Sequence, residues 1–157
     1  MLLTDELKNH GFLLQNVNHN DLEYYINVKR TCYKTYVDEH YGGWVENTQI
    51  DMNTAIFTKT IKDSCFKKII LNDVIVGFLS YNEGIDRIDE ISIQMIGIAQ
   101  HQGIGSLYLQ YITALSIEKK KPIFLKVFKT NPAQNLYKRF GFETYAETVT
   151  HYLMRFN

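Results

Sequence analysis

The sequence predicts an α/β fold, more exactly an α+β mixed sheet with helices, on three observations. The chain has 157 residues, of which 45% are hydrophobic, a size and composition that suit one buried core. Runs rich in β-branched and aromatic residues alternate with stretches of helical period. No repeat, low-complexity tract or Pro/Ser-rich linker divides the chain. We therefore expect a single domain over residues 1–157, with the element order β-α-α-β-β-β-α-β-α-β-β.

The first part of the chain predicts one strand and two helices. Residues 11–17 are typical of a short strand, and Asn20 followed three residues later by Glu23 predicts a capped helix start. Apolar residues then recur close to helical spacing as far as Tyr36, and Tyr41-Gly42-Gly43-Trp44 ends the helix. A second, weaker helical pattern covers residues 46–57.

Three strands are expected next. The β-rich runs 66–71 and 74–81 flank Asn72-Asp73, a dipeptide suited to a tight turn, so they predict an antiparallel hairpin. A third run covers residues 88–96 and alternates polar and apolar side chains.

The second half of the chain contains two helical patterns and three β-rich runs. From Gly103 an apolar stripe of helical spacing predicts a long helix, which ends at the basic residues before Pro122. Asn131-Pro132 provides a cap and a first-turn proline for a short helix that Gly141 closes. Strands are expected at 123–128, 142–146 and 148–156.

Charge and cysteine content exclude several classes of function. Seventeen Lys and Arg balance seventeen Asp and Glu, whereas proteins that bind nucleic acid carry a basic excess. Cys32 and Cys65 are isolated, which predicts reduced thiols and no zinc site. The start has no basic and apolar leader pattern, and no stretch approaches the about 18 apolar residues of a membrane span. We expect a cytoplasmic protein that binds no nucleic acid, membrane or metal.

One segment has the residue types of an anion site. A glycine-rich turn that leads into a helix leaves backbone N–H groups unpaired at the positive end of the helix dipole, which suits a phosphate or pyrophosphate. Neither a Walker lysine nor the third glycine of the dinucleotide fingerprint is present, which lowers the rank of those nucleotide classes. The turn consists of Gln100, His101, Gln102, Gly103, Ile104 and Gly105.

The short helix from Asn131 to Phe142 carries the second motif. Capping explains Asn131 and Gly141, but it does not explain Tyr137. Taken together, Q-x-x-G-x-G and the later N-P-A-x-x-L-Y-x-R-x-G-F resemble the two signature motifs of the GNAT N-acetyltransferase superfamily. The resemblance covers essentially the whole chain.

The resemblance implies an acyltransferase that binds acetyl-CoA and moves the acetyl group to an amine by direct attack in a ternary complex. The amine belongs to a small molecule, a peptide or a protein. The resemblance further implies that the 100–105 turn holds the CoA pyrophosphate and that Asn131 contacts the pantetheine arm. Tyr137 would donate a proton or a hydrogen bond to the departing thiolate. The strand expected to pair with pantetheine ends in Ile93, Gln94 and Met95.

Amine acetylation also needs a base, because an alkylammonium has no free lone pair at neutral pH. Alternation places Glu90 on one strand face with Ser92 and Gln94, which predicts a solvated polar cleft, and makes Glu90 our base candidate. Asp89 and a water path remain open alternatives. A backbone N–H near Met95 is the candidate for stabilising the charge of the tetrahedral intermediate.

The acceptor site is expected among aromatic residues. Tyr36, Tyr41 and Trp44 follow the first strand, and aromatic walls suit an alkylammonium or an amphipathic amine through cation–π contact. Trp44 comes directly after Gly-Gly, so a loop position is expected for it.

Two other classes of function compete with this interpretation. One is a non-catalytic acyl-CoA-binding sensor or interaction module of the same fold, which would have no need of Tyr137. The other is a nucleotide-binding domain, although lysine and acidic metal ligands are absent near the turn. A homodimer is possible in either case, and strand 148–156 is the place where we expect pairing.

Overall fold

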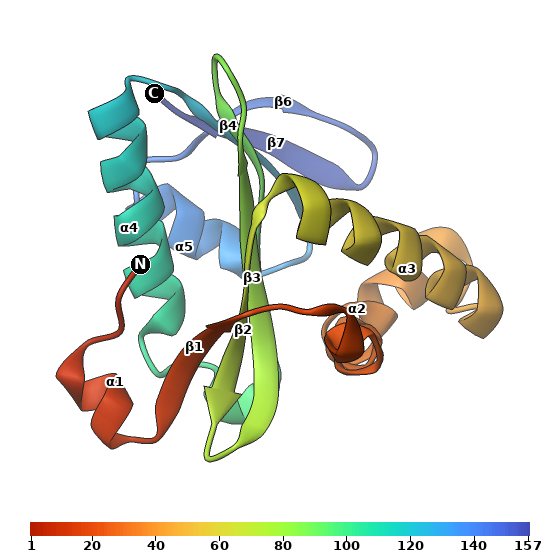
Figure 1. The fold of residues 1–157 in the computed structure, drawn as a ribbon. Coiled ribbons are helices and arrows are strands. Elements are labelled where there is room, and N and C mark those ends of the chain that lie inside the picture. Colours follow the sequence, from red (N-terminus) through yellow and green to blue (C-terminus); the bar gives the residue numbers. More distant parts are fainter.

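A computed structural model describes residues 1–157 as a mixed sheet with helices on both faces (Figure 1). The seven strands are β1 (Phe12–Asn16), β2 (Cys65–Leu71), β3 (Val74–Glu83), β4 (Ile88–Met95), β5 (Ile123–Phe128), β6 (Glu143–Glu147) and β7 (His151–Phe156). The helices are α1 (Asp5–Asn9), α2 (Leu22–Tyr41), α3 (Glu46–Asp63), α4 (Ile104–Lys119) and α5 (Ala133–Arg139), with 3-10 turns η1 (His19–Asp21) and η2 (Gly97–Ala99). The predicted α/β class is confirmed, and α1 is the one α-helix that the sequence patterns missed.

The sheet changes direction at one place. Its order is β1-β2-β3-β4-β5-β7-β6, and every neighbouring pair is antiparallel except β4 and β5. A parallel pair needs a crossover connection, which α4 provides. The pairing of β4 with β5 is limited to Ile88 and Ile123, after which the two strands separate.

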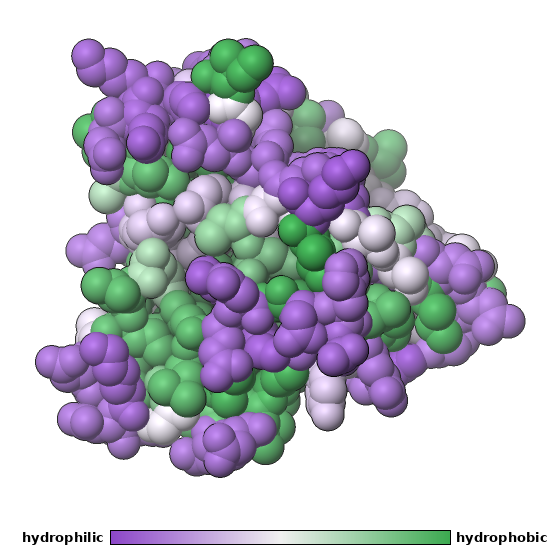
Figure 2. All heavy atoms as spheres, viewed as in Figure 1, coloured by the Kyte–Doolittle hydropathy of each residue, from purple (hydrophilic) through white to green (hydrophobic).

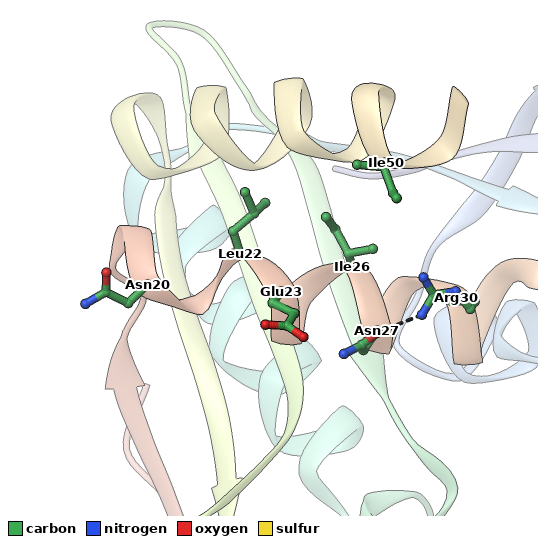
Figure 3. Close-up of a pocket in the computed structure, with 7 residues that line it drawn as sticks. All are labelled: Asn20, Leu22, Glu23, Ile26, Asn27, Arg30 and Ile50. Carbon is green, nitrogen blue, oxygen red and sulfur yellow. Dashed lines mark hydrogen bonds between the residues drawn. The ribbon is translucent and has the colours of Figure 1, made fainter. Parts of the chain in front are cut away.

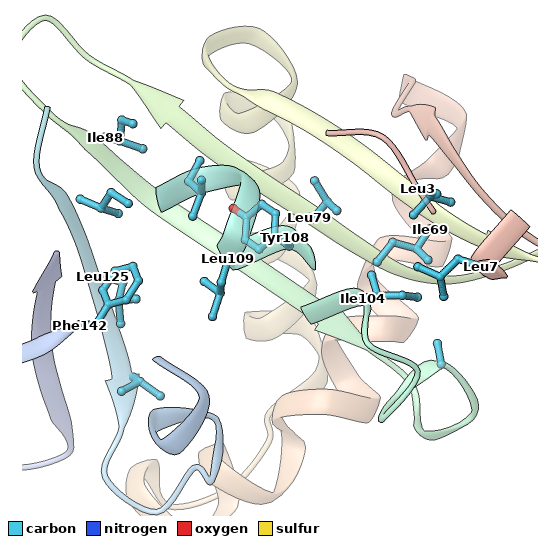
Figure 4. Close-up of a cluster of buried hydrophobic side chains, with 14 of the residues drawn as sticks. Leu3, Leu7, Ile69, Leu79, Ile88, Ile104, Tyr108, Leu109, Leu125 and Phe142 are labelled. Atoms are coloured by element: carbon cyan, nitrogen blue, oxygen red, sulfur yellow. The ribbon is translucent and has the colours of Figure 1, made fainter. Parts of the chain in front are cut away.

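The two faces of the sheet are covered by different helices. In Figure 1, α2 and α3 lie to the right of the central strands, and α1, α4 and α5 lie to the left. The left face holds the larger core (Figure 4), in which α4 buries Ile104, Tyr108 and Ile112 completely, as its apolar stripe predicts. The smaller core on the other face consists of Tyr25, Val28, Phe57, Phe66 and Phe78.

The hydrogen-bonded cap before α2 is that of the 3-10 turn η1 and uses Asn18 and Asp21 in place of the predicted Asn20–Glu23 pair, whereas α2 itself begins at Leu22 without a side-chain cap. The Asn18 side chain accepts a hydrogen bond from the Asn20 N–H at 2.9 Å, and the Asp21 carboxylate accepts one from the Asn18 N–H at 2.8 Å. The same carboxylate pairs with the buried Lys68 ammonium at 2.8 and 3.0 Å. Because Asp21 serves both partners, the turn before α2 is held against β2. The second helix is also longer than predicted, since α3 continues to Asp63.

The strands at the edges of the sheet are not the one that we expected to pair between two copies of the chain. The final strand β7 lies between β5 and β6, so it has no free edge. The outermost strands of the sheet are β1 and β6, and all five residues of β6 are exposed. Figure 2 shows apolar side chains gathered in the lower part of the view, over β1 and beside the polar side chains of α1. Any strand pairing between copies would therefore involve β1 or β6 and not residues 151–156.

An irregularity interrupts the pairing of β3 with β4. Ser80 pairs with Ser92 and Asn82 pairs with Asp89, so two residues of β4 oppose one of β3. The buried Tyr108 of α4 donates a hydrogen bond from its hydroxyl to the Ser80 carbonyl at 2.7 Å. The hydroxyl of a core tyrosine thus satisfies a backbone group beside the bulge.

We expect Tyr108→Phe to lower the free energy of unfolding by about 1–2 kcal/mol, because it removes a hydrogen bond in a fully buried setting. Urea denaturation measures the change. Tyr111→Phe is the matched control on the same helix, since its hydroxyl meets only that of Tyr81 in a half-buried position. Equal stability losses for the two variants would contradict this role of Tyr108.

Candidate active site

The separation of β4 from β5 leaves one edge of β4 without a partner strand. We call this edge, residues 89–95 on the side of β5, the free edge of β4. Its last carbonyl, that of Met95, accepts hydrogen bonds from the Gln100 side chain at 2.7 Å and from the Cys32 thiol at 3.5 Å. Unpaired strand groups of this kind can pair with an extended ligand. Cys32 also shows that α2 passes over the end of this strand.

β3 stays paired with β4 as far as Met95 because Gly77 permits a close contact there. Gly77 pairs with Met95, and a Cβ on Gly77 would lie 2.4 Å from the Gln94 carbonyl oxygen. Only glycine permits such an approach.

The predicted glycine-rich turn has the geometry of an anion site. His101 and Gly103 adopt left-handed backbone conformations with φ of +60° and +84°. No side chain caps α4. The backbone N–H groups of residues 101–106 have no hydrogen-bond acceptor within the chain. The first N–H group that is bonded is that of Leu107, which donates to the Gly103 carbonyl. These N–H groups lie at the positive end of a 16-residue helix, where they favour a negative charge.

The second motif lies against the first. A Cβ on Gly105 would be 3.2 Å from Cδ2 of Leu136, so the start of α4 packs closely on α5. Asn131 caps α5 as predicted, because its side-chain oxygen accepts a hydrogen bond from the Ala133 N–H at 2.9 Å. The sequence motifs that are about thirty residues apart thus form one structural unit.

Tyr137 is oriented inward from α5. Its ring packs on Phe142 with centroids 5.8 Å apart, and its hydroxyl forms no hydrogen bond within the chain. Burial raises the pKa of Tyr137 to about 12, so the phenol keeps its proton at neutral pH. The titratable neighbours of Tyr137 include Tyr33 on α2 and Tyr108 on α4.

Glu90, the predicted base, occupies the bulge of β4. It adopts a left-handed conformation with φ of +51°, and its carboxylate accepts a hydrogen bond from the Lys59 ammonium of α3 at 2.5 Å. Asp89, the alternative, accepts hydrogen bonds from Asn82 and Arg87, each at 3.0 Å. Both carboxylates therefore already have side-chain partners.

The polar face of β4 is less open to solvent than its alternation suggests. Gln94 donates to the Ser92 hydroxyl at 2.7 Å, so these two residues share a face as predicted, but Gln94 is only 5% exposed. The prediction of a solvated cleft is wrong at this position, because Gln94 pairs with Phe78 of the smaller core and lies beneath Tyr25 of α2. Its side-chain oxygen has no hydrogen-bond partner.

The structure separates the predicted acceptor residues. Tyr36 stacks on Phe128 with ring centroids 5.1 Å apart, and Tyr41 meets the same ring at 6.2 Å. His151 approaches this ring from β7 at 4.1 Å. Trp44 does not join this group, since its indole N–H donates to Glu46 at the start of α3.

Sequence reasoning missed Lys29. It lies on the sheet-facing stripe of α2, where its ammonium is 4.8 Å from the ring centre of Tyr33 and 5.4 Å from that of Tyr25. Burial lowers the pKa of Lys29 to about 8. Cys32 opposes this shift in part, and the nearby Lys126 adds a smaller lowering. The signal in the sequence is a cation at the helical spacing of an otherwise apolar and aromatic stripe.

A shallow groove of about 440 Å³ lies elsewhere, between α2 and α3 (Figure 3). Leu22, Ile26 and Ile50 point toward one another in it, and Arg30 at its end bonds to Asn27. None of the residues that carry the two motifs lines this groove. No helix is long and apolar enough to cross a bilayer, and no group of three His, Cys, Asp or Glu side chains could hold a metal ion.

Comparison with known proteins gives one family and one fold. A model of the acetyltransferase (GNAT) family matches residues 29–142. The PaiA N-acetyltransferase of Thermoplasma acidophilum in complex with coenzyme A has a TM-score of 0.71 and 16% identity, over 92% of this chain and 97% of that chain. The ribosomal-protein-S18-alanine N-acetyltransferase of Escherichia coli has a TM-score of 0.64 and 16% identity, over 92% of each chain. Among curated proteins, no sequence matches this chain.

Proposed function

Since the chain belongs to the acetyltransferase (GNAT) family, we propose that it transfers an acetyl group from acetyl-CoA to an amine by direct attack in a ternary complex. The observation that carries the proposal is the contact of Gly105 with Leu136. It joins the row of unpartnered N–H groups at the start of α4 to the helix that presents Tyr137.

Acetyl-CoA fits the residues on this side of the sheet. The N–H groups of residues 101–106 would hold the pyrophosphate, which needs no excess of basic side chains. The free edge of β4 would pair with the pantetheine arm through Ile93, Gln94 and Met95. The side-chain nitrogen of Asn131 has no partner in the chain and would donate to the same arm.

The transfer itself can be written with its protons. The amine nitrogen forms a bond to the thioester carbon, and the carbon–sulfur bond breaks when the tetrahedral intermediate collapses. A Met95 N–H on the free edge would stabilise the intermediate oxygen. Tyr137 supplies a proton to the leaving thiolate, and the amine gives up its own proton to a base, so that protons balance over one turnover.

Glu90 is the proposed base. Its carboxylate lies on the strand that would hold the thioester, and it must exchange its contact with Lys59 for one with the amine or with a bridging water. Asp89 and a water path are the alternatives for the same step.

Acetyl-CoA at 100 times its dissociation constant should stabilise the protein by about 2.7 kcal/mol, because a ligand of the native state raises the melting temperature. We expect Gly103→Ala to reduce this shift, since it disturbs the turn that binds the anion. Gly42→Ala is the matched control: both glycines have positive φ and no neighbour within 4 Å of an added Cβ, but Gly42 lies after α2. An equal ligand shift in both variants, or none in the wild type, would contradict the proposed site.

Tyr137→Phe should lower kcat by about 100-fold while leaving acetyl-CoA binding nearly unchanged, because it removes a proton donor and little packing. Thiol release from acetyl-CoA in the presence of amines measures turnover, and thermal shift measures binding. Tyr145→Phe, on the exposed strand β6, is the control. If the wild type binds acetyl-CoA but none of the amines causes it to release thiol, the protein would instead be the non-catalytic sensor module.

Glu90→Gln should suppress the rise of the rate with pH that a carboxylate base produces, because the amide cannot take up a proton. The pH dependence of kcat/KM provides the measurement, with Lys59→Met as the companion variant that frees Glu90 from its ion pair. A profile that Glu90→Gln leaves intact would assign the proton transfer to Asp89 or to water.

A further inference from the structure

An uncompensated cation lies over the end of β4. Lys29 is four residues from both Tyr25 and Tyr33, so all three share the face of α2 that looks toward the sheet. Cys32, on the same face, reaches the Met95 carbonyl at the end of the free edge. Lys29 is therefore close to the place where the proposed function puts the thioester.

No negative charge faces Lys29. It takes part in no ion pair or side-chain hydrogen bond of the chain. The titratable groups around it are Tyr25, Cys32 and Tyr33 on its own helix, Lys126 on β5, Tyr137 on α5 beyond Tyr33, and His151 on β7 beside Lys126. Because burial raises the pKa of the tyrosines and of Cys32, none of these groups supplies an anion at neutral pH.

The polar neighbour of Lys29 on β4 is Gln94, which the Tyr25 side chain covers. Gln94 is 95% buried, and its side-chain amide faces the Tyr25 hydroxyl, a hydrogen-bonding group of the chain itself. It pairs with Phe78, whose ring packs on Tyr25 at 5.3 Å, so Gln94 and Lys29 both adjoin the Tyr25 side chain. The group that lacks a complement at this end of β4 is therefore the Lys29 cation, which suits a ligand with an anionic group.

We propose that the acceptor amine also carries a carboxylate and that Lys29 binds this carboxylate. This inference rests on the proposed acetyl transfer. Of the two acceptors expected from the sequence, an alkylammonium or an amphipathic amine, it disfavours the simple alkylammonium, because Lys29 already occupies the faces of Tyr25 and Tyr33 and, with Lys126, repels a further cation.

Matched acceptor pairs test the charge requirement. Thiol release is measured with glycine, methionine and phenylalanine, with the amides of these amino acids, and with the corresponding amines that lack the carboxylate. The wild type should use the acids with kcat/KM on the order of tenfold or more above the amides, since a charge-assisted hydrogen bond is lost in the amide. Equal or better use of the amides would overturn the proposal.

Lys29→Met keeps the apolar stem and removes the charge. We expect it to abolish the preference for acids, mainly through KM, while Lys34→Met on the exposed side of α2 leaves the preference intact. Each variant is first checked for an unchanged thermal shift with CoA. A fall in kcat that is equal for acids and amides would overturn the proposal, since it would assign Lys29 to the reacting carbonyl and not to the acceptor.

A binding measurement separates this inference from the proposed function. The CoA-loaded protein is titrated with N-acetylated methionine and with its amide, and the dissociation constants are compared between pH 6.5 and 9.5. The acid should bind tighter below pH 8 and lose this advantage above it, because Lys29 must then take up a proton on binding. Tighter binding of the acid without any turnover would overturn acetyl transfer alone, whereas equal binding of acid and amide would overturn the carboxylate site.

Discussion

The single pairing of Ile88 with Ile123 is the constraint on which the site depends. Because β4 and β5 separate beyond it, the sheet contains a strand edge in its middle that no other strand covers. The crossover helix α4 begins at this edge, α5 packs on its first turn, and α2 crosses the opposite face. One incomplete ladder thus brings residues from both faces and from distant parts of the chain to the same place.

In the proposed function, a neutral chain would bind a polyanion through backbone groups. The turn at residues 101–106 offers backbone N–H groups, which do not appear in a count of basic residues. In the proposed acceptor site, the positive charge would instead come from one side chain, Lys29, whose pKa burial lowers. The two faces of the sheet would then hold negative groups in different ways: through oriented backbone dipoles on one, and through a single ammonium on the other.

Most of the fold could be predicted because periodicity records which face of an element is buried. Helix α1 escaped because five residues are too short to show a period. The start of α2 was close to its predicted place, but the capping pair differed, because Asn18 with Asp21 and Asn20 with Glu23 have the same spacing and both resemble a cap. The bulge at Glu90 does not interrupt the alternation of polar and apolar residues in the sequence, so only the pairing register of β3 and β4 reveals it. The burial of Gln94 depends on α2, and no local pattern in β4 could show it. Motif resemblance, in contrast, pointed directly to the turn and to Tyr137, which the structure brings into one unit.

The Met95 carbonyl already has two hydrogen-bond partners within the chain. Gln100, the first residue of the glycine-rich turn, donates a hydrogen bond from its side-chain amide to this oxygen, and Cys32 donates one from its thiol. A ligand strand that pairs at Met95 would exchange these bonds for new ones, so the net gain is the difference between them. Displacing Gln100 would also release the turn from the strand, so occupancy at one end of a long ligand changes the free energy of binding at the other. Two fragments of such a ligand would therefore bind with a coupling energy, and their separate affinities would not multiply to that of the intact molecule.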